Sequence, residues 1–272
     1  MNPMDVDRSF SGSIPQLYEQ LLVPLIFAPY ADDLARRAEA LRPASVLELA
    51  AGTGVVTRAL ARALPVETGI VASDLNQPML DHAASIGTAR PVRWQQADAL
   101  ELPFADGAFD LVVCQFGVMF FADKPRAFAE ARRVLRKGGT LLFSAWDRIE
   151  VNELAHEVSL ALETLFPADP PRFMARTPHG YHDKARIAAD LAQGGFASAM
   201  QLDTVAARSI AASAREPAVD YCQGTPWRNE IEARSPPGLN AATQGATEAI
   251  ERRFGNGRID AAIQAHVVAI VK

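Results

Sequence analysis

The sequence predicts an α/β fold built on a doubly wound, mostly parallel sheet with helical additions. Apolar stretches of strand length alternate with amphipathic helical stretches between residues 44 and 146. The stretches VLELA, GIVAS, LVVCQF and TLLFSAW are almost continuously apolar, as strands covered on both faces must be. Hydrophobic residues make up 49% and charged residues 22% of the 272 residues, which is typical of a globular chain and excludes a disordered one.

The region before this alternation is expected to be helical. Residues 1–13 are rich in Ser, Asp and Gly and predict a flexible start. A helix is expected over 16–28, bent at Pro24, because proline has no N–H to donate inside a helix. A second helix is expected over 32–41, with its first residue, an aspartate, as the N-cap. These helices form a first region, residues 1–43.

The second region, residues 44–146, carries the alternation itself. The expected elements are strand 45–49, helix 55–64, strand 68–73, helix 77–85, strand 92–96, strand 109–115, helix 125–136 and strand 140–146. Strands that alternate with helices pair in parallel through right-handed crossovers. This region is therefore predicted to form the parallel part of the sheet.

The third region, residues 147–272, combines helical insertions with two further strands. The expected elements are helix 152–166, a proline-rich loop, helix 185–193, strand 199–205, helical segments over 213–255 interrupted at Pro236–Pro237, and strand 261–271. These helices are predicted to form a cap that binds the substrate.

Charge and cysteine content narrow the class of protein further. The chain has 27 Lys+Arg and 32 Asp+Glu, a net charge of −5, which gives no electrostatic footprint for nucleic acid. Two cysteines, Cys114 and Cys222, cannot build a disulfide framework, so we expect a cytoplasmic protein. The sequence shows neither an apolar run of membrane-spanning length nor a signal peptide, and no membrane insertion is expected.

The main functional feature is a glycine loop between the first strand and the following helix, in VLELAAGTGVV. Gly52, Thr53 and Gly54 stand where ligands bind in open parallel sheets, at the carboxyl end of a strand and the start of a helix. An ordinary tight turn is the alternative. The dinucleotide fingerprint would require glycine at position 57, but this chain has Thr57, which argues against a nicotinamide-dependent oxidoreductase.

Three acids accompany the loop. Glu48 lies within the first strand, Asp74 ends the second, and Asp98 follows the third. An acid at the end of the second strand can accept both hydroxyls of a ribose, although Asp74 could instead cap a helix. Together these acids predict a pocket for a cationic adenosine ligand without phosphates, which is the chemistry of S-adenosylmethionine.

The motifs ELAAGTG, SDLNQPML, ADALELPF, FDLVVCQFGVMFF and EARRVLRKGGTLLFSAW occur in this order. In this the sequence resembles the class I S-adenosylmethionine-dependent methyltransferases, and within them the small-molecule group similar to ubiquinone/menaquinone methyltransferases. The resemblance implies a Rossmann-like sheet of seven strands. Its last strand would be antiparallel and inserted beside the sixth, with 199–205 and 261–271 as the candidates.

The resemblance also implies a cofactor site. The glycine loop would face the methionine part, Asp74 the ribose, and Asp98 the adenine amino group. Residues at the end of the fourth strand would line the cleft beside the methyl group, and N-terminal helices would close over the cofactor. The implied cofactor contacts are Tyr18, Glu48, Leu49, Ala50, Gly52, Thr53, Gly54, Asp74, Leu75, Met79, Asp98, Ala99, Gln115 and Phe116.

No catalytic dyad stands out, which suits methyl transfer, because in-line displacement from a sulfonium requires mainly alignment and exclusion of water. A general base is needed only if the acceptor loses a proton. The candidate bases are His179, Tyr181 and His182, and the candidate acceptor contacts are Tyr30, Tyr181, Tyr221 and Trp227. Two histidines without suitably spaced Cys or carboxylates do not predict a metal site.

The sequence thus predicts an enzyme that methylates a small-molecule acceptor. The alternative is a protein that binds S-adenosylmethionine without transferring its methyl group, since one fold hosts many functions. A cavity filled by side chains from residues 213–235 would favour that alternative. The sequence leaves a homodimer open.

Overall fold

The protein is described by a computed structural model that covers residues 14–234 and 236–272. Seven strands form one sheet in the order β3-β2-β1-β4-β5-β7-β6. The strands are β1 Ser45–Glu48, β2 Gly69–Asp74, β3 Arg93–Gln96, β4 Phe109–Gln115, β5 Leu135–Trp146, β6 Gln201–Ala211 and β7 Ile259–Val271. The predicted flexible start at residues 1–13 lies outside the described residues.

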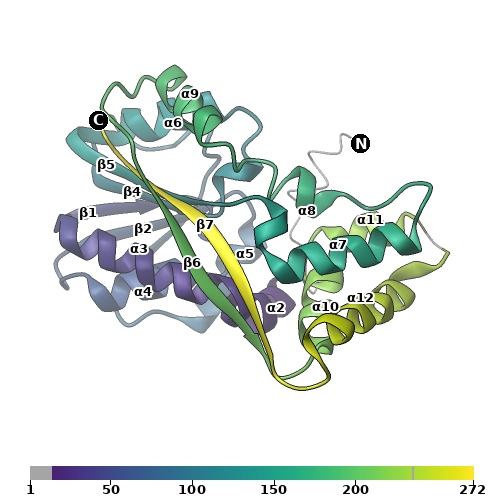
Figure 1. The fold of residues 1–272 in the computed structure, drawn as a ribbon. Coiled ribbons are helices and arrows are strands. Elements are labelled where there is room, and N and C mark those ends of the chain that lie inside the picture. Colours follow the sequence, from purple (N-terminus) through teal and green to yellow (C-terminus); the bar gives the residue numbers. More distant parts are fainter. Residues whose placement is uncertain (1–13, 235) are drawn as a thin grey trace.

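Helices cover both faces of the sheet, and a further group gathers at one end of it (Figure 1). The α-helices are α2 Ile14–Leu17, α3 Ala28–Leu41, α4 Val55–Ala63, α5 Gln77–Ile86, α6 Lys124–Val134, α7 Glu153–Leu165, α8 Phe173–Arg176, α9 Lys184–Gln193, α10 Arg215–Gln223, α11 Trp227–Glu232 and α12 Gly238–Phe254. The remaining helices are the π-helix η1 Tyr18–Phe27 and the 3₁₀-helices η2 Val118–Phe120 and η3 Ile149–Val151.

The sheet topology confirms the predicted fold class. Strands β1 to β5 pair in parallel, and β7 is antiparallel between β5 and β6. Strand β6 is longer than the predicted 199–205, because it pairs with β7 as far as Ala211. The first half of β7 pairs with β6 alone, so the two strands run as a ribbon past β5 towards the helices at the end of the sheet (Figure 1).

Alternation along the strands divides the core into two layers. Val46, Leu111 and Leu142 pack with residues of α3 and α4 on one face. Their neighbours Leu47 and Phe143 pack on the other face, in the cluster that also holds residues of α6 and α9. Successive side chains of a strand point to opposite faces, so a strand buried on both sides must be apolar throughout.

The N-terminal helices differ from the prediction in one respect. The chain passes from α2 through η1 into α3 without a break, so Asp32 lies inside α3 and does not cap a new helix. Pro29 stands in the first turn of α3, which begins directly after the end of η1. Pro24 lies inside η1, whose wider turns carry the helix past a residue that cannot donate an N–H.

Candidate functional site

The glycine loop adopts a backbone that requires glycine. Gly52 and Gly54 have φ values of 56° and 86°, in the left-handed region that favours glycine. A Cβ on Gly54 would lie 3.1 Å from the ring of Trp94 and 3.2 Å from Cβ of Ala83. A Cβ on Gly52 would instead point towards Met79 and Tyr18. Gly54 therefore packs against the protein, whereas Gly52 leaves its space to the pocket described below.

Asp74 connects the end of β2 to this loop. One carboxylate oxygen accepts a hydrogen bond from the backbone N–H of Gly52 at 2.9 Å, and the other accepts one from the N–H of Asn76 at 2.8 Å. Burial raises the pKa of Asp74, and these hydrogen bonds oppose that rise because they favour the charged form. The N-cap of α5 is Asn76, so Asp74 does not cap that helix itself.

A pocket opens at the carboxyl ends of β1, β2 and β4, with a cavity volume of about 110 Å³. We call it the glycine-loop pocket. It is lined by Tyr18, Leu49, Ala50, Gly52, Ser73, Asp74, Leu75, Asn76, Met79, Ala97, Asp98, Ala99, Leu100, Gln115, Phe116, Gly117, Phe120, Phe121 and Ala122. None of these described residues is Lys or Arg, so the only charged side chains on the described wall are carboxylates, and its charge is negative.

All the expected cofactor contacts except Glu48, Thr53 and Gly54 line this pocket. Glu48 is 2% exposed, and its carboxylate accepts a hydrogen bond of 2.6 Å from the hydroxyl of Thr57. Burial raises the pKa of Glu48 to about 8. Glu48 and Thr57 thus hold the first turn of α4 to β1 beneath the loop, a function for Thr57 that the missing glycine gave no reason to expect.

Gln115 ties the sheet to the N-terminal helices. Its side-chain amide donates a hydrogen bond of 3.3 Å to the backbone oxygen of Phe27, at the end of η1. Its Oε1 is buried and accepts no hydrogen bond from the part of the chain that the structure describes. A buried carbonyl oxygen without a hydrogen bond costs free energy. A ligand that donated a hydrogen bond to Oε1 would therefore bind more tightly.

A second pocket adjoins the first, because Tyr18, Phe116 and Phe120 line both. We call it the aromatic pocket; its cavity volume is about 60 Å³. Its lining residues are Tyr18, Leu22, Ile26, Phe27, Phe116, Phe120, Trp146, Phe173, Met174, Pro178, Tyr221, Thr225 and Pro226. Elements from both ends of the sequence therefore meet here: η1, the ends of β4 and β5, α8 and α10.

Of the four expected acceptor contacts, Tyr221 lines the aromatic pocket. Tyr30 is fully buried behind the wall, where its ring packs perpendicular to the rings of Phe116 and Trp146 and its hydroxyl donates a hydrogen bond to the backbone oxygen of Val205. Phe116 and Trp146 stack with ring centroids 3.8 Å apart. Tyr30 therefore supports the aromatic wall from outside the cavity.

Trp227 and Tyr181 line neither pocket. Trp227 is fully buried at the start of α11, with its indole nitrogen lacking a partner among the described residues. The hydroxyl of Tyr181 donates a hydrogen bond of 2.8 Å to Asp190 on α9. Packing within the helical layers thus removes both side chains from the cavity walls.

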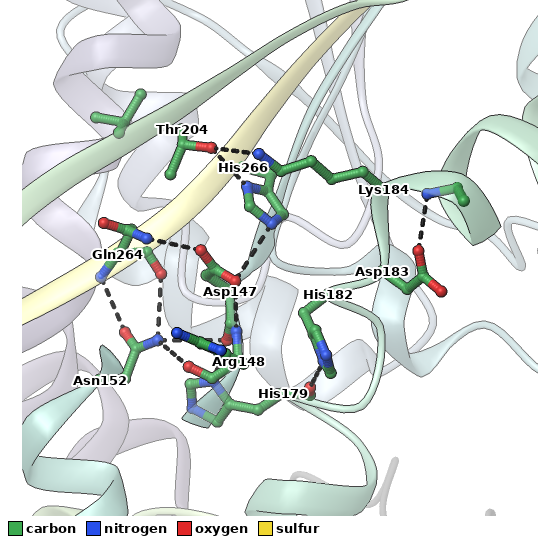
Figure 2. Close-up of polar contacts among 12 residues, drawn as sticks. Asp147, Arg148, Asn152, His179, His182, Asp183, Lys184, Thr204, Gln264 and His266 are labelled. Atoms are coloured by element: carbon green, nitrogen blue, oxygen red, sulfur yellow. Dashed lines mark hydrogen bonds and ion pairs between the residues drawn. The ribbon is translucent and has the colours of Figure 1, made fainter. Parts of the chain in front are cut away.

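The two candidate histidines also lie outside the pockets, in a polar network around Asp147 (Figure 2). Burial lowers the pKa of His179 to about 4, and its Nδ1 lies 2.8 Å from the backbone oxygen of Asp147. His182 is exposed and bonds through Nδ1 to the backbone oxygen of His179. Pro178 lines the aromatic pocket, but the chain then turns towards β5 and β7. Both histidines therefore lie away from the pocket.

Sequence reasoning missed several residues of the aromatic wall. Phe120 and Phe121 belong to the motif that follows β4, and their position after the strand could have indicated a place in the cleft. Phe173 and Met174 come from a segment that we expected to be only a proline-rich loop, and it forms the short helix α8. No local pattern shows that this helix meets η1, because only the tertiary fold brings them together.

Comparisons with known proteins agree on one family. Residues 47–143 match the methyltransferase domain family. The ubiquinone/menaquinone biosynthesis C-methyltransferase UbiE of Teredinibacter turnerae is 29% identical over 201 residues, which cover 69% of this chain and 76% of that protein. The protein of the same name from Escherichia coli K12 / DH10B is 32% identical over 171 residues, 58% of this chain and 68% of that protein.

Solved structures share the fold. The YcgJ protein of Bacillus subtilis superposes with a TM-score of 0.57 at 20% identity, over 90% of this chain and 98% of that one. Haemonchus contortus phosphoethanolamine N-methyltransferase 2, in complex with phosphomonomethylethanolamine and S-adenosylhomocysteine, gives a TM-score of 0.60 at 15% identity, over 99% and 60% of the two chains. Within residues 14–234 and 236–272, no helix is both long and apolar enough to cross a membrane.

Proposed function

The chain belongs to the class I S-adenosylmethionine-dependent methyltransferases, and on that basis we propose that its acceptor is a small organic molecule bound in the aromatic pocket. The observation that carries the proposal is the shared wall: Tyr18, Phe116 and Phe120 line both pockets. A cofactor in one pocket and an acceptor in the other would meet at these side chains. S-adenosylmethionine supplies a methyl group that is activated by its sulfonium charge.

The glycine-loop pocket fits the cofactor in shape and charge. Asp74 would accept the two ribose hydroxyls, and Asp98 the adenine amino group. Leu75 and Met79 would pack against the adenine. The absence of Lys and Arg from the described wall favours a cationic sulfonium over a diphosphate, which would seek positive charge or free backbone N–H groups.

The aromatic pocket favours an acceptor with an apolar, ring-sized body. Apart from Tyr18, Tyr221 and Thr225, its described walls carry apolar side chains. The hydroxyl of Tyr221 makes no hydrogen bond with the described residues. Burial raises the pKa of this hydroxyl, so it stays protonated and can donate a hydrogen bond to an oxygen of the methyl acceptor. Relatives named as ubiquinone/menaquinone biosynthesis C-methyltransferases support a small organic acceptor as well.

The side chains that line the aromatic pocket favour catalysis by alignment of the reacting groups. None of its described lining residues is His, Lys, Asp or Glu, so no strong base faces the cavity. The enzyme would hold nucleophile, methyl carbon and sulfur in line and exclude water. Tyr221 and Thr225 from the 213–235 segment line the cavity without filling it, which favours transfer over binding alone.

A methyl-transfer assay tests this proposal. The protein would be incubated with methyl-labelled S-adenosylmethionine and a panel of hydroxylated aromatic compounds, with transfer RNA, DNA and a mixed peptide pool as competing classes. We expect label in the small-molecule fraction. Label found only in nucleic acid or peptide would contradict the proposal.

For a compound that is methylated, Tyr221→Phe should raise KM by about tenfold, the worth of one hydrogen bond. It should leave the Kd for S-adenosylhomocysteine within about twofold of the wild-type value. Tyr181→Phe is the matched control, because that hydroxyl bonds to Asp190 away from both pockets. Equal KM values for the two variants would show that Tyr221 does not contact the acceptor.

A further inference from the structure

A third cavity lies on the other side of η1 from the aromatic pocket. We call it the α10 cavity; its volume is about 570 Å³, larger than either pocket described above. It is lined by Gln20, Leu21, Pro24, Leu25, Ile210, Ala211, Ala212, Glu216, Asp220 and Arg258. Helix η1 thus separates two cavities: Leu22 and Ile26 face the aromatic pocket, whereas Leu21 and Leu25 line the α10 cavity.

Asp220 is the unusual member of this wall. The residue is 2% exposed, yet its carboxylate accepts no hydrogen bond from any residue that the structure describes, and its Oδ1 is fully buried. A buried carboxylate normally has several donors, because losing water without replacing its hydrogen bonds costs free energy. Burial and the nearby Glu216 accordingly raise the pKa of Asp220 to about 8.

The other charged groups of the cavity leave Asp220 unpaired. One oxygen of Glu216 accepts a hydrogen bond of 2.9 Å from the backbone N–H of Ala212, and no hydrogen bond joins Glu216 to Asp220. Arg258 is exposed and forms no ion pair with either carboxylate. When Asp220 is ionised, two carboxylates against one guanidinium leave the cavity with an excess of negative charge.

The rest of the wall restricts what could neutralise that charge. Except for the amide of Gln20, it consists of alkyl groups from Leu21, Pro24, Leu25 and Ile210 and of two alanines. Mg²⁺ or Ca²⁺ takes six or more oxygen ligands from protein and water, and such a hydrated ion would make no apolar contact with the alkyl part of this wall. An ammonium group has three N–H donors, and an attached alkyl chain would bury apolar surface against the leucines.

We propose that the α10 cavity binds a short primary alkylammonium ion, with its ammonium group hydrogen-bonded to Asp220 and its alkyl chain against Leu21 and Leu25. The site is separate from the cofactor and acceptor pockets, because only η1 and α10 contribute to both regions and they do so through different side chains. The proposal does not depend on the identity of the methyl acceptor.

Isothermal titration of the full chain with n-butylammonium chloride tests this site, with 1-butanol and sodium butyrate as matched ligands. At about pH 8.5 the amine is charged, and Asp220 is largely ionised. We expect saturable binding of butylammonium with one site per chain and no saturable binding of the alcohol or the carboxylate. Absence of saturable binding by butylammonium, or equal binding of butanol, would overturn the proposal.

Asp220→Asn keeps the shape of the side chain and removes its charge, so it should weaken butylammonium binding by about tenfold or more. Asp106→Asn, at an exposed carboxylate paired with Arg133, should leave binding unchanged. A Kd for S-adenosylhomocysteine within about twofold of wild type would show that Asp220→Asn is folded. Equal amine binding by both variants, or loss of amine binding when S-adenosylhomocysteine saturates the protein, would show that the amine binds elsewhere.

Discussion

At the scale of single residues, the candidate cofactor site depends on contacts between side chains and the backbone of the glycine loop. Asp74 accepts hydrogen bonds from Gly52 and Asn76, and Thr57 donates to Glu48 below the loop. The sequence predicted the place of Asp74, because an acid at the end of the second strand has a specific use. It did not predict the Thr57–Glu48 pair, since both residue types are common in strands and helices.

Substitution of Asp74 tests its proposed contact with the ribose. Asp74→Asn should weaken binding of S-adenosylhomocysteine by about 10- to 100-fold, because hydrogen bonds to a charged acceptor contribute about 1.5–3 kcal/mol. The measurement is isothermal titration. Asp81→Asn, on the exposed side of α5, should bind as the wild type does. Similar affinities for the two variants would exclude Asp74 as a ribose contact.

At the scale of elements, the segment before β1 and the short helix α8 determine the shape of the aromatic pocket. The sequence predicted helices on both sides of Pro29 but not their continuity, because a proline in the first turn of a helix and one in its middle look alike in sequence. Glu230 on α11 binds the start of helix α8: it accepts hydrogen bonds from the backbone N–H groups of Arg172 and Phe173 and pairs with Arg176.

Removing the charge of Glu230 should therefore loosen α8. In Glu230→Gln we expect amide hydrogens of α8 to exchange about tenfold faster than in the wild type, since the loss of charged hydrogen bonds costs about 1 kcal/mol or more. Hydrogen–deuterium exchange with mass spectrometry measures this. Glu232→Gln, which loses only a surface pair with Arg228, is the control. Unchanged exchange in Glu230→Gln would show that packing of Phe173 alone holds the helix.

At the scale of the whole molecule, two strands separated by a long insertion complete the sheet and bring the helices of that insertion, α10, α11 and α12, to the end of it (Figure 1). The seven strands and the antiparallel last strand could be predicted, because the apolar strand patterns and the family resemblance agree. The aromatic pocket could not be predicted, because η1, α8 and α10 lie far apart in sequence and each carries only an ordinary apolar face. The candidate bases failed to reach a pocket for the same reason: their orientation depends on contacts outside the pockets, such as that of His179 with Asp147 and that of Tyr181 with Asp190.

The stability of the whole molecule should depend on the ionisation of Asp220. Its pKa is 3.8 in a model peptide and about 8 in the folded chain, so the folded state holds the proton more tightly. The protonated carboxyl of Asp220 therefore contributes fully to the free energy of unfolding below about pH 4, and this contribution is lost as the pH rises towards 8. Asp220→Asn should unfold like the wild type near pH 4 and be more stable by about 1–3 kcal/mol near pH 8.

Urea unfolding across this pH range measures the difference. Asp106→Asn provides the control for the loss of an exposed carboxylate. A difference between Asp220→Asn and wild type that stayed constant with pH would show that folding does not change the pKa of Asp220, and would contradict the prediction.

We propose that the glycine-loop pocket holds the cofactor and opens towards the aromatic pocket. The most direct measurement is a crystal structure of the protein with S-adenosylhomocysteine. We predict the ribose hydroxyls within hydrogen-bonding distance of Asp74 and the sulfur beside Tyr18, Phe116 and Phe120, where the two pockets meet. S-adenosylhomocysteine bound elsewhere, or with its sulfur facing away from these three side chains, would show that the two pockets do not serve as cofactor and acceptor sites.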